Sequence, residues 1–410
     1  MKYPDFYTEE MRQMESSDIV DRKVAALLRG MTLEEKLNMV HGVPNPPDRG
    51  VVANAAYSCG VARLGVPEMR MYDGPAGTQS LYDTTGLPCH QVLGSSWSRQ
   101  LAYGYGKVMG LDNAAISGNV QFGAQFDMVR TCHYSRSKDS ISEDPYLTSM
   151  LAVEETKGIQ DQGVICDVKH YATLSQDMSS RYTKDLYIDE QTLHELYLPA
   201  FEAAMKEGNA GSAMTCHAMV DGEHTSNNRY LLQEVLRHQW DWKGFVINDW
   251  GGNHVFSLPN GLDMETPYGN HNSSRVCRRK LEEGTLSLAE IDTAVSHVLY
   301  GMAAAGFLAE VQLDAEGNVL EEPGRTAPIR LPLTYPEKQD QILDFGGKYA
   351  LELARKGAVL LKNNGVLPLQ ESDYTDGKSV AMIGLGALHA ICGEGGERSF
   401  GVLRHMDSPY

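Results

Sequence analysis

The chain has 410 residues, which is enough for one large domain and a second, smaller one. Its hydrophobic content of 42% and charged content of 22% are those of an ordinary globular protein and exclude a disordered one. The formal net charge of −18 argues against nucleic acid and anionic membrane surfaces as partners, and it fits a neutral ligand.

The N-terminus and the cysteines bear on where the protein works. Residues 1–5 precede no apolar stretch of the kind found in a secretion signal, and no run approaches the ~20 apolar residues of a membrane span. The seven cysteines are scattered without a C-x-x-C pair, and Cys166 and Cys216 lie inside apolar runs. Such cysteines are typical of reduced, buried residues, so we expect a cytoplasmic protein.

Short apolar strands alternate with amphipathic helices over the first three quarters of the chain. The predicted strands are residues 164–168, 212–216 and 245–248. Their intervals suit repeated βα units and a parallel sheet. Asp189 predicts the start of a helix that ends at Gly208, and a later helix is expected over 288–305. By itself, this alternation fits either a doubly wound sheet or a barrel.

The pattern changes after residue 308. Residues 309–336 are acidic and contain prolines, which indicates a linker, and a helix is predicted over about 339–356. Its residues Ile342, Phe345 and Leu351 are expected to pack on the preceding domain. We therefore divide the chain into a first domain over residues 1–308, a linker and connecting helix over 309–357, and a further unit over 358–410.

The segment 244–251 carries the clearest chemical signal. Its apolar residues predict a strand buried on both faces, and the carboxylate of Asp249 and the indole of Trp250 follow at once. Parallel sheets and barrels keep their chemistry at the C-terminal ends of their strands, so Asp249 is a candidate catalytic group. Trp250 is an apolar platform of the kind on which sugar rings stack. Taken alone, the segment is better explained by a helix N-cap aspartate beside a core tryptophan.

Further motifs surround this segment in a characteristic order. They are Lys169-His170-Tyr171-Ala172 and residues 195–201, 214–217 and 261–265. In this order the set closely resembles glycoside hydrolase family 3, the retaining β-glucosidases, β-xylosidases and their relatives. The resemblance extends from residue 31 to about residue 402. It implies an α/β chain with a (β/α)8 TIM-like barrel, followed by the truncated start of an α/β sandwich domain whose first strand is 380–384.

The resemblance implies roles for individual residues. In the family, the aspartate of a Ser-Asp-Trp motif is the nucleophile; it falls here on Asp249, with Asn248 in place of the serine. His217 stands where the family has a tyrosine that orients the nucleophile. A histidine there can still donate a hydrogen bond to Asp249, with a proton that titrates near neutrality. Trp250 completes the motif.

Four other residues match sugar-binding positions of the family. Asp73 matches an aspartate that accepts hydrogen bonds from sugar hydroxyls, and Arg136 matches an arginine that contacts the sugar. Lys169 and His170 match a pair that grips adjacent hydroxyls. Without the family, Asp73 would be explained equally well by a turn, and Arg136 better by a surface ion pair. Gln176 and Arg181 match a further segment.

Retaining hydrolysis also needs a carboxylic acid that protonates the leaving oxygen. In most of the family this is a glutamate far into the second domain, and a subset uses a His-Asp dyad on a barrel loop. Residues 173–185 contain no histidine. Asp139, Asp177 and Glu265 are the acids nearest to predicted strand ends, but no motif supports any of them, so none is assigned.

The sequence therefore predicts a retaining, exo-acting β-glycosidase that hydrolyses β-glycosides at the non-reducing end through a covalent glycosyl-enzyme on Asp249. Its partner is a small carbohydrate; no cofactor, metal, nucleic acid or membrane is implied. Strand 380–384 has no neighbours within the chain, so pairing with another copy is one expected outcome. Two alternatives stay open: a carbohydrate-binding pseudoenzyme, and an incomplete chain that lacks the general acid/base.

Overall fold

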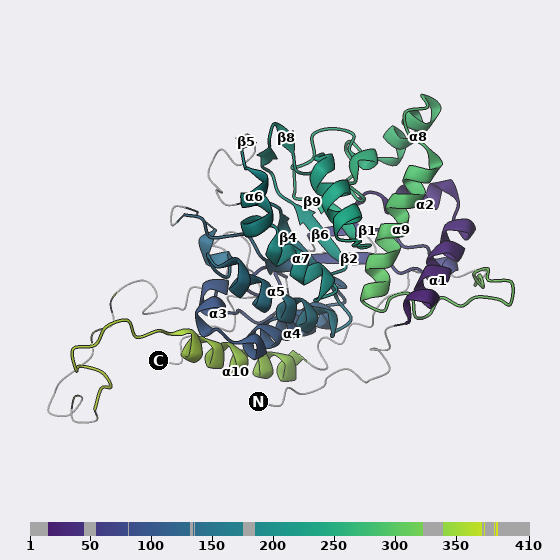
Figure 1. Ribbon diagram of the computed structural model, residues 1–410. Helices are drawn as coiled ribbons and strands as arrows, with labels where there is room; N and C mark the ends of the chain where they lie inside the picture. The colour runs from purple at the N-terminus through teal and green to yellow at the C-terminus, as the bar shows by residue number, and fades with distance from the viewer. Residues whose placement is uncertain are drawn as a thin grey trace.

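The computed structural model describes residues 15–44, 55–80, 82–131, 134, 136–174, 185–322 and 339–370, with single residues 373, 381 and 383. A six-stranded sheet lies at the centre of this part (Figure 1). Its strands, in spatial order, are β1 (Ala56–Ser58), β2 (Met69–Asp73), β3 (Val120–Gln125), β4 (Ile165–Tyr171), β6 (Ser212–Thr215) and β9 (Phe245–Asn248). β1 is antiparallel to β2, and the other neighbouring strands are parallel.

Helices cover the sheet, as the buried strands require. They are α1 (Ser17–Gly30), α2 (Leu33–Met39), α3 (His90–Ser96), α4 (Arg99–Ala115), α5 (Pro145–Gln160), α6 (Glu190–Thr192), η5 (Leu193–Tyr197), α7 (Pro199–Lys206), η6 (Tyr230–Gln239), α8 (Ser274–Glu282), α9 (Leu288–Ala304) and α10 (Gln339–Gly357). Short 3-10 turns are η3 (Ala62–Leu64), η4 (Ser137–Asp139) and η7 (Leu258–Asn260). Capping boxes at Thr32 and Ser287 begin α2 and α9 by satisfying the first backbone N–H groups.

Helices α4 and α5 pack closely because two glycines face the other helix. A Cβ added at Gly106 would overlap the carbonyl oxygen of Glu155, and one added at Gly158 would overlap that of Tyr103. The backbones therefore approach to a distance that no larger residue allows at these two positions. This contact secures the helical layer behind β3 and β4.

The predicted barrel is confirmed only in part. The described residues form an α/β fold with a curved, mixed sheet. Beyond β9 the pairing continues only through isolated bridges, from Ile247 to Met264 and from Glu265 to His41. Pro44 and Pro267 follow these bridges, and proline cannot donate to a ladder. The sheet is thus a half-barrel, and the expected eight-stranded (β/α)8 barrel is not confirmed.

The predicted elements agree with the structure apart from their ends. β4 and β6 differ from the predicted strands by a few residues, and β9 matches 245–248. The helix predicted between Asp189 and Gly208 is divided into α6, the π-helical turn η5 and α7. Pro199 begins α7, where its missing N–H interrupts the helical hydrogen bonds. A small sheet of β5 (Asp185–Leu186), β7 (Met219–Val220) and β8 (Glu223–His224) lies apart from the central one.

Helix α10 packs on α3 and α4, where Ile342 and Phe345 are buried as expected. The expectation for Leu351 is wrong, because half of this residue is exposed. Tyr349 and Leu353 continue the stripe that begins at Ile342 and Phe345, at spacings of three and four residues, and Leu351 falls on the opposite side.

The part of the chain after α10 is only partly described. Residues 358–370 form neither helix nor strand, and Leu361 is exposed. Most of the predicted strand 380–384 and all residues from 384 onward lie outside the described residues, so the boundaries of the proposed second unit stay predictions. None of the described helices is long and apolar enough to cross a membrane.

Candidate active site

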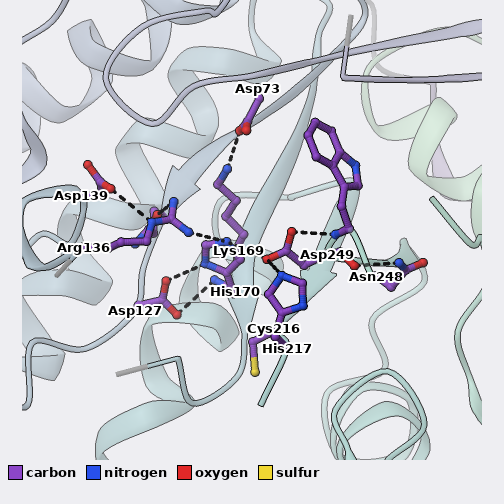
Figure 2. Close-up of polar contacts among 12 residues, drawn as sticks. Asp73, Asp127, Arg136, Asp139, Lys169, His170, Cys216, His217, Asn248 and Asp249 are labelled. Atoms are coloured by element: carbon purple, nitrogen blue, oxygen red, sulfur yellow. Dashed lines mark hydrogen bonds and ion pairs between the residues drawn. The ribbon is translucent and has the colours of Figure 1, made fainter. Parts of the chain in front are cut away.

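The C-terminal ends of four parallel strands bring the predicted side chains together (Figure 2). Asp73 ends β2, Lys169 and His170 lie in β4, His217 follows β6 and Asp249 follows β9. Arg136 reaches the same place from the loop before η4, and Trp250 comes next to Asp249. Residues far apart in the sequence meet here because parallel strands end at one edge of the sheet.

Asp249 lies at the centre of the cluster. Its Oδ1 accepts a hydrogen bond from the Trp250 N–H at 2.7 Å, and its Oδ2 lies 2.9 Å from Nε2 of His217. Burial by itself raises the pKa of this carboxyl, but the neighbouring His217, His170 and Arg136 together outweigh burial and hold the pKa well below its usual range. The side chain keeps 17% of its surface exposed. Asp249 is therefore an ionised carboxylate that a ligand can reach.

Asn248 anchors the peptide that carries Asp249. Its Oδ1 accepts from the Thr266 N–H at 2.8 Å, and its Nδ2 donates to the Thr266 carbonyl at 2.8 Å. The Thr266 hydroxyl donates in turn to the Asn248 carbonyl at 2.7 Å. Asparagine supplies both a donor and an acceptor here, so the residue that replaces the family's serine fixes the end of β9 to the following segment.

His217 is buried against the loop that follows Asp249. A Cβ added at Gly252 would lie 3.3 Å from Nδ1 of His217 and 2.9 Å from the Asp249 carbonyl oxygen. The loop thus turns back over the imidazole ring. This packing limits how far His217 can move away from Asp249.

Asp73 and Lys169 form an ion pair at the edge of the cluster. The Lys169 Nζ lies 2.5 Å from Oδ1 of Asp73, which also accepts from the Gly74 N–H at 2.8 Å. Lys169 is buried, whereas 26% of the Asp73 side chain is exposed. The pair offers a fixed cation and a fixed acceptor, which suits the hydroxyls of a neutral polar ligand.

Asp127 is a member of the cluster that the sequence analysis missed. It accepts from Nδ1 of His170 at 2.8 Å and from the His170 backbone N–H at 3.2 Å. The other ring nitrogen of His170, Nε2, lies 3.2 Å from Nη1 of Arg136. Burial and the charge of Arg136 lower the pKa of His170 well below its usual range. The sequence offered one signal for this role: Asp127 lies two residues after the end of β3, where the functional side chains gather.

Arg136 is held on each of its three nitrogens. Nη2 donates to Oε1 of Gln125 at 2.7 Å, Nη1 meets His170, and Nε lies 3.4 Å from Oδ2 of Asp139. Asp139 also accepts from Lys138 at 3.1 Å. The guanidinium plane is therefore fixed beside His170 and does not form the surface ion pair that the residue type alone would suggest.

Two of the acids considered as proton donors bind other residues. Asp139 pairs with Arg136 and Lys138. Glu265 is buried; its Oε2 accepts backbone N–H groups of residues 270, 271 and 272 at 2.8, 2.8 and 2.7 Å, and its Oε1 accepts from Asn253. Asp177 lies outside the described residues, as do Gln176 and Arg181. We assign no general acid among the described carboxyl groups.

Trp250 and Asp167 complete the surroundings. The Trp250 Nε1 is buried and has no hydrogen-bond partner among the residues that the structure describes. Asp167, two residues before Lys169 in β4, is fully buried and accepts from the Ser212 hydroxyl at 2.5 Å. Burial raises the pKa of Asp167 to about 8, so this carboxyl is protonated at neutral pH.

Comparison with known proteins gives a consistent family. The profile of the glycosyl hydrolase family 3 N-terminal domain matches residues 2–300. β-Glucosidase B of Emericella nidulans is 31% identical over 390 residues, covering 92% of this chain and 42% of that protein. Thermostable β-glucosidase B of Acetivibrio thermocellus is 31% identical over 376 residues, covering 88% of this chain and 44% of that protein.

Solved structures of similar fold belong to the same group of enzymes. DesR, a β-glucosidase from Streptomyces venezuelae in complex with D-glucose, has a TM-score of 0.73 at 30% identity, over 85% of this chain and 43% of its own. β-Glucosidase 3B from Thermotoga neapolitana, in complex with glucose, has the same TM-score and identity, over 85% of this chain and 48% of its own. The chain thus spans less than half the length of these relatives. On the profile match and these similarities, the chain belongs to glycosyl hydrolase family 3.

Proposed function

We propose that this chain carries the nucleophile and the sugar-binding groups of a retaining, exo-acting β-glucosidase. The relatives with about 30% identity are β-glucosidases, and two of the similar structures hold glucose. The single observation that carries the proposal is the state of Asp249. It is an ionised, partly exposed carboxylate at the end of a parallel strand, with a buried histidine and an arginine around it.

In the proposed reaction, Asp249 attacks the anomeric carbon of the terminal sugar. A bond forms between a carboxylate oxygen and that carbon while the bond to the leaving oxygen breaks, and water then hydrolyses the glycosyl-enzyme. The low pKa keeps Asp249 anionic throughout the neutral range. His217 supports one oxygen and the Trp250 N–H supports the other, which orients the carboxylate for attack.

The surrounding groups suit a sugar in the site. Lys169 and Asp73 provide a donor and an acceptor on one side, and the fixed guanidinium of Arg136 lies on another. Fixed polar groups around the hydroxyls allow binding to tighten at the oxocarbenium-like transition state. Trp250 follows Asp249 directly in the chain and brings an apolar indole to this segment. Glucose is the proposed sugar, in line with the relatives.

Asp139 and Glu265, the two described acids that were considered as proton donors, are both bound to other partners. General-acid help typically contributes about 10²–10⁴-fold to the rate. We therefore expect the chain by itself to act on glycosides with good leaving groups and to act poorly on natural disaccharides. A proton donor supplied by another polypeptide would restore the hydrolysis of natural disaccharides.

The test is hydrolysis of a nitrophenyl β-glucoside by the purified chain. The proposal expects release of nitrophenolate that Asp249→Ala abolishes. Asp344→Ala is the matched control, because Asp344 is an exposed aspartate of α10 that pairs with Lys348. No hydrolysis, combined with calorimetric binding of glucose, would instead identify a carbohydrate-binding pseudoenzyme.

A further inference from the structure

We propose that Asp127 is a positioning residue that fixes the proton of His170 on Nδ1 and so keeps Nε2 as an acceptor for Arg136. In this arrangement His170 does not donate to Asp249, and the nearer histidine nitrogen is Nε2 of His217. The inference deepens the proposed function and rests on it for its catalytic consequence. Its structural part, the position of one proton, can be measured without any substrate.

Asp127 contacts one edge of the His170 ring. This carboxylate is 2% exposed, and both of its oxygens face His170. Oδ1 accepts from the backbone N–H at 3.2 Å, and Oδ2 lies 2.8 Å from Nδ1. One oxygen already accepts from the backbone N–H, and an acceptor oxygen at Oδ2 calls for a proton on Nδ1. The contact with the backbone N–H holds one oxygen while the other oxygen faces the ring.

Arg136 contacts the other edge of the ring. Its guanidinium has only donors and cannot lose its proton, and its Nη1 lies 3.2 Å from Nε2 of His170. Nε2 must therefore present a lone pair. The acceptor on one edge of the ring and the donor on the other demand the same neutral tautomer. The lowered pKa of His170 agrees with a ring that stays neutral.

The consequence falls on Asp249. Its Oδ2 lies 3.6 Å from Nε2 of His170, beyond a normal hydrogen-bond distance, and no proton lies between the two atoms in this tautomer. The same oxygen is 2.9 Å from Nε2 of His217. Asp249 thus has the His217 nitrogen at close range and no proton from His170, and its charge remains available for attack. His170 contributes to the sugar site by holding Arg136, and it has no Nε2 proton to give to a hydroxyl.

The geometry also explains why an aspartate is needed at residue 127. An asparagine would turn an NH2 group toward one of the two N–H groups of His170. Moving the ring proton of His170 to Nε2 would remove this clash between two donors. At Nε2 the proton would face Nη1 of Arg136 on one side and Asp249 on the other. Asp127→Asn is therefore expected to disturb both the arginine and the nucleophile without changing any atom of either.

The experiment is ¹⁵N NMR of the full chain labelled at histidine nitrogens, without ligand. The His170 resonances are assigned by their loss in His170→Gln. We expect a protonated Nδ1 and an unprotonated Nε2 throughout pH 5–8, and a change of tautomer or loss of a single ring state in Asp127→Asn. A His170 ring protonated on Nε2 in the wild-type chain would overturn the inference, and this result does not depend on whether the mutant folds.

Kinetics provide the second readout. With a nitrophenyl β-glucoside, Asp127→Asn is expected to lower kcat by about 10–10²-fold, the size expected when hydrogen bonds to charged groups are disturbed, with a smaller change in KM. Unchanged kcat together with an altered tautomer would overturn the positioning role. Failure of the proposed function is distinguishable, because it would abolish turnover in the wild type and leave the NMR result intact.

Discussion

Nε2 of His217 lies 2.9 Å from Oδ2 of Asp249, at the position where the family pattern predicts a tyrosine. The imidazole is buried between the ends of β6 and β9, and the turn at Gly252 covers it. The imidazole beside Asp249 helps to hold the pKa of the carboxyl below its usual range. Substrate turnover should therefore depend on the side chain at this position.

His217→Phe should raise the pKa of Asp249 toward its usual range, because it removes the donor that opposes burial. The depressed pKa keeps Asp249 ionised down to acid pH, so the acid limb of kcat/KM should move to higher pH in the variant. The rate at neutral pH should fall by about 10–10²-fold, the value of a hydrogen bond to a charged group. His217→Tyr, which restores a donor, is the control. A pH profile that His217→Phe leaves unchanged would contradict the assigned contact.

Asp167 should make the free energy of unfolding fall as pH rises. Its pKa of about 8 in the native state lies above the unfolded value of about 3.9, so the native chain holds a proton that the unfolded chain loses between these values. Its stabilisation is complete below about pH 4 and is lost as pH rises through about 8. Asp112, with a pKa of about 7, acts in the same direction.

Urea unfolding at several pH values tests this prediction. Asp167→Asn keeps a hydrogen-bonding partner for Ser212 but cannot titrate, so the loss of stability between pH 5 and 8 should become shallower by about 1 kcal/mol per pH unit. The exposed Asp344→Asn is the control and should follow the wild type. Parallel curves for Asp167→Asn and the wild type would show that the buried carboxyl does not hold its proton.

Gly158→Ala should destabilise the chain by about 1–3 kcal/mol, because the added Cβ meets the Tyr103 carbonyl of α4 and neither backbone can yield. Gly347→Ala is the matched control. Gly347 also lies within a helix, α10, but no atom lies within 4 Å of an added Cβ. The free energy of unfolding of that variant should increase by about 0.5–1 kcal/mol, because alanine has a higher helix propensity than glycine. Equal midpoints for the two variants in thermal unfolding would mean that α4 and α5 pack more loosely.

The sequence predicted those features that depend on local patterns. Apolar runs located β4, β6 and β9, and parallel pairing then brought Lys169, His217 and Asp249 to one edge. Asp127 was missed because its partner His170 is 43 residues away, and nothing local distinguishes a carboxylate that accepts from a distant ring. The same holds for the reciprocal bonds between Asn248 and Thr266.

Local sequence patterns also could not predict how the sheet continues beyond β9. Residues 40–43 and 263–266 pair only through isolated bridges. Their position depends on non-local contacts, such as the hydrogen bonds that Glu265 accepts from backbone N–H groups after Pro267. Leu351 shows the opposite case, in which hydrophobicity alone was a poor guide. Helical spacing from Ile342 places Tyr349 and Leu353, and not Leu351, on the buried face.

Covalent labelling of Asp249 tests the central claim most directly. A 2-deoxy-2-fluoro β-glucoside with an activated leaving group slows hydrolysis of the glycosyl-enzyme, and its good leaving group needs little help from a general acid. Mass spectrometry of the digested chain should find one added fluoroglucosyl group, on the peptide that contains Asp249, and none in Asp249→Ala. A label on another carboxylate, or one that persists in Asp249→Ala, would contradict the assignment of Asp249 as the nucleophile.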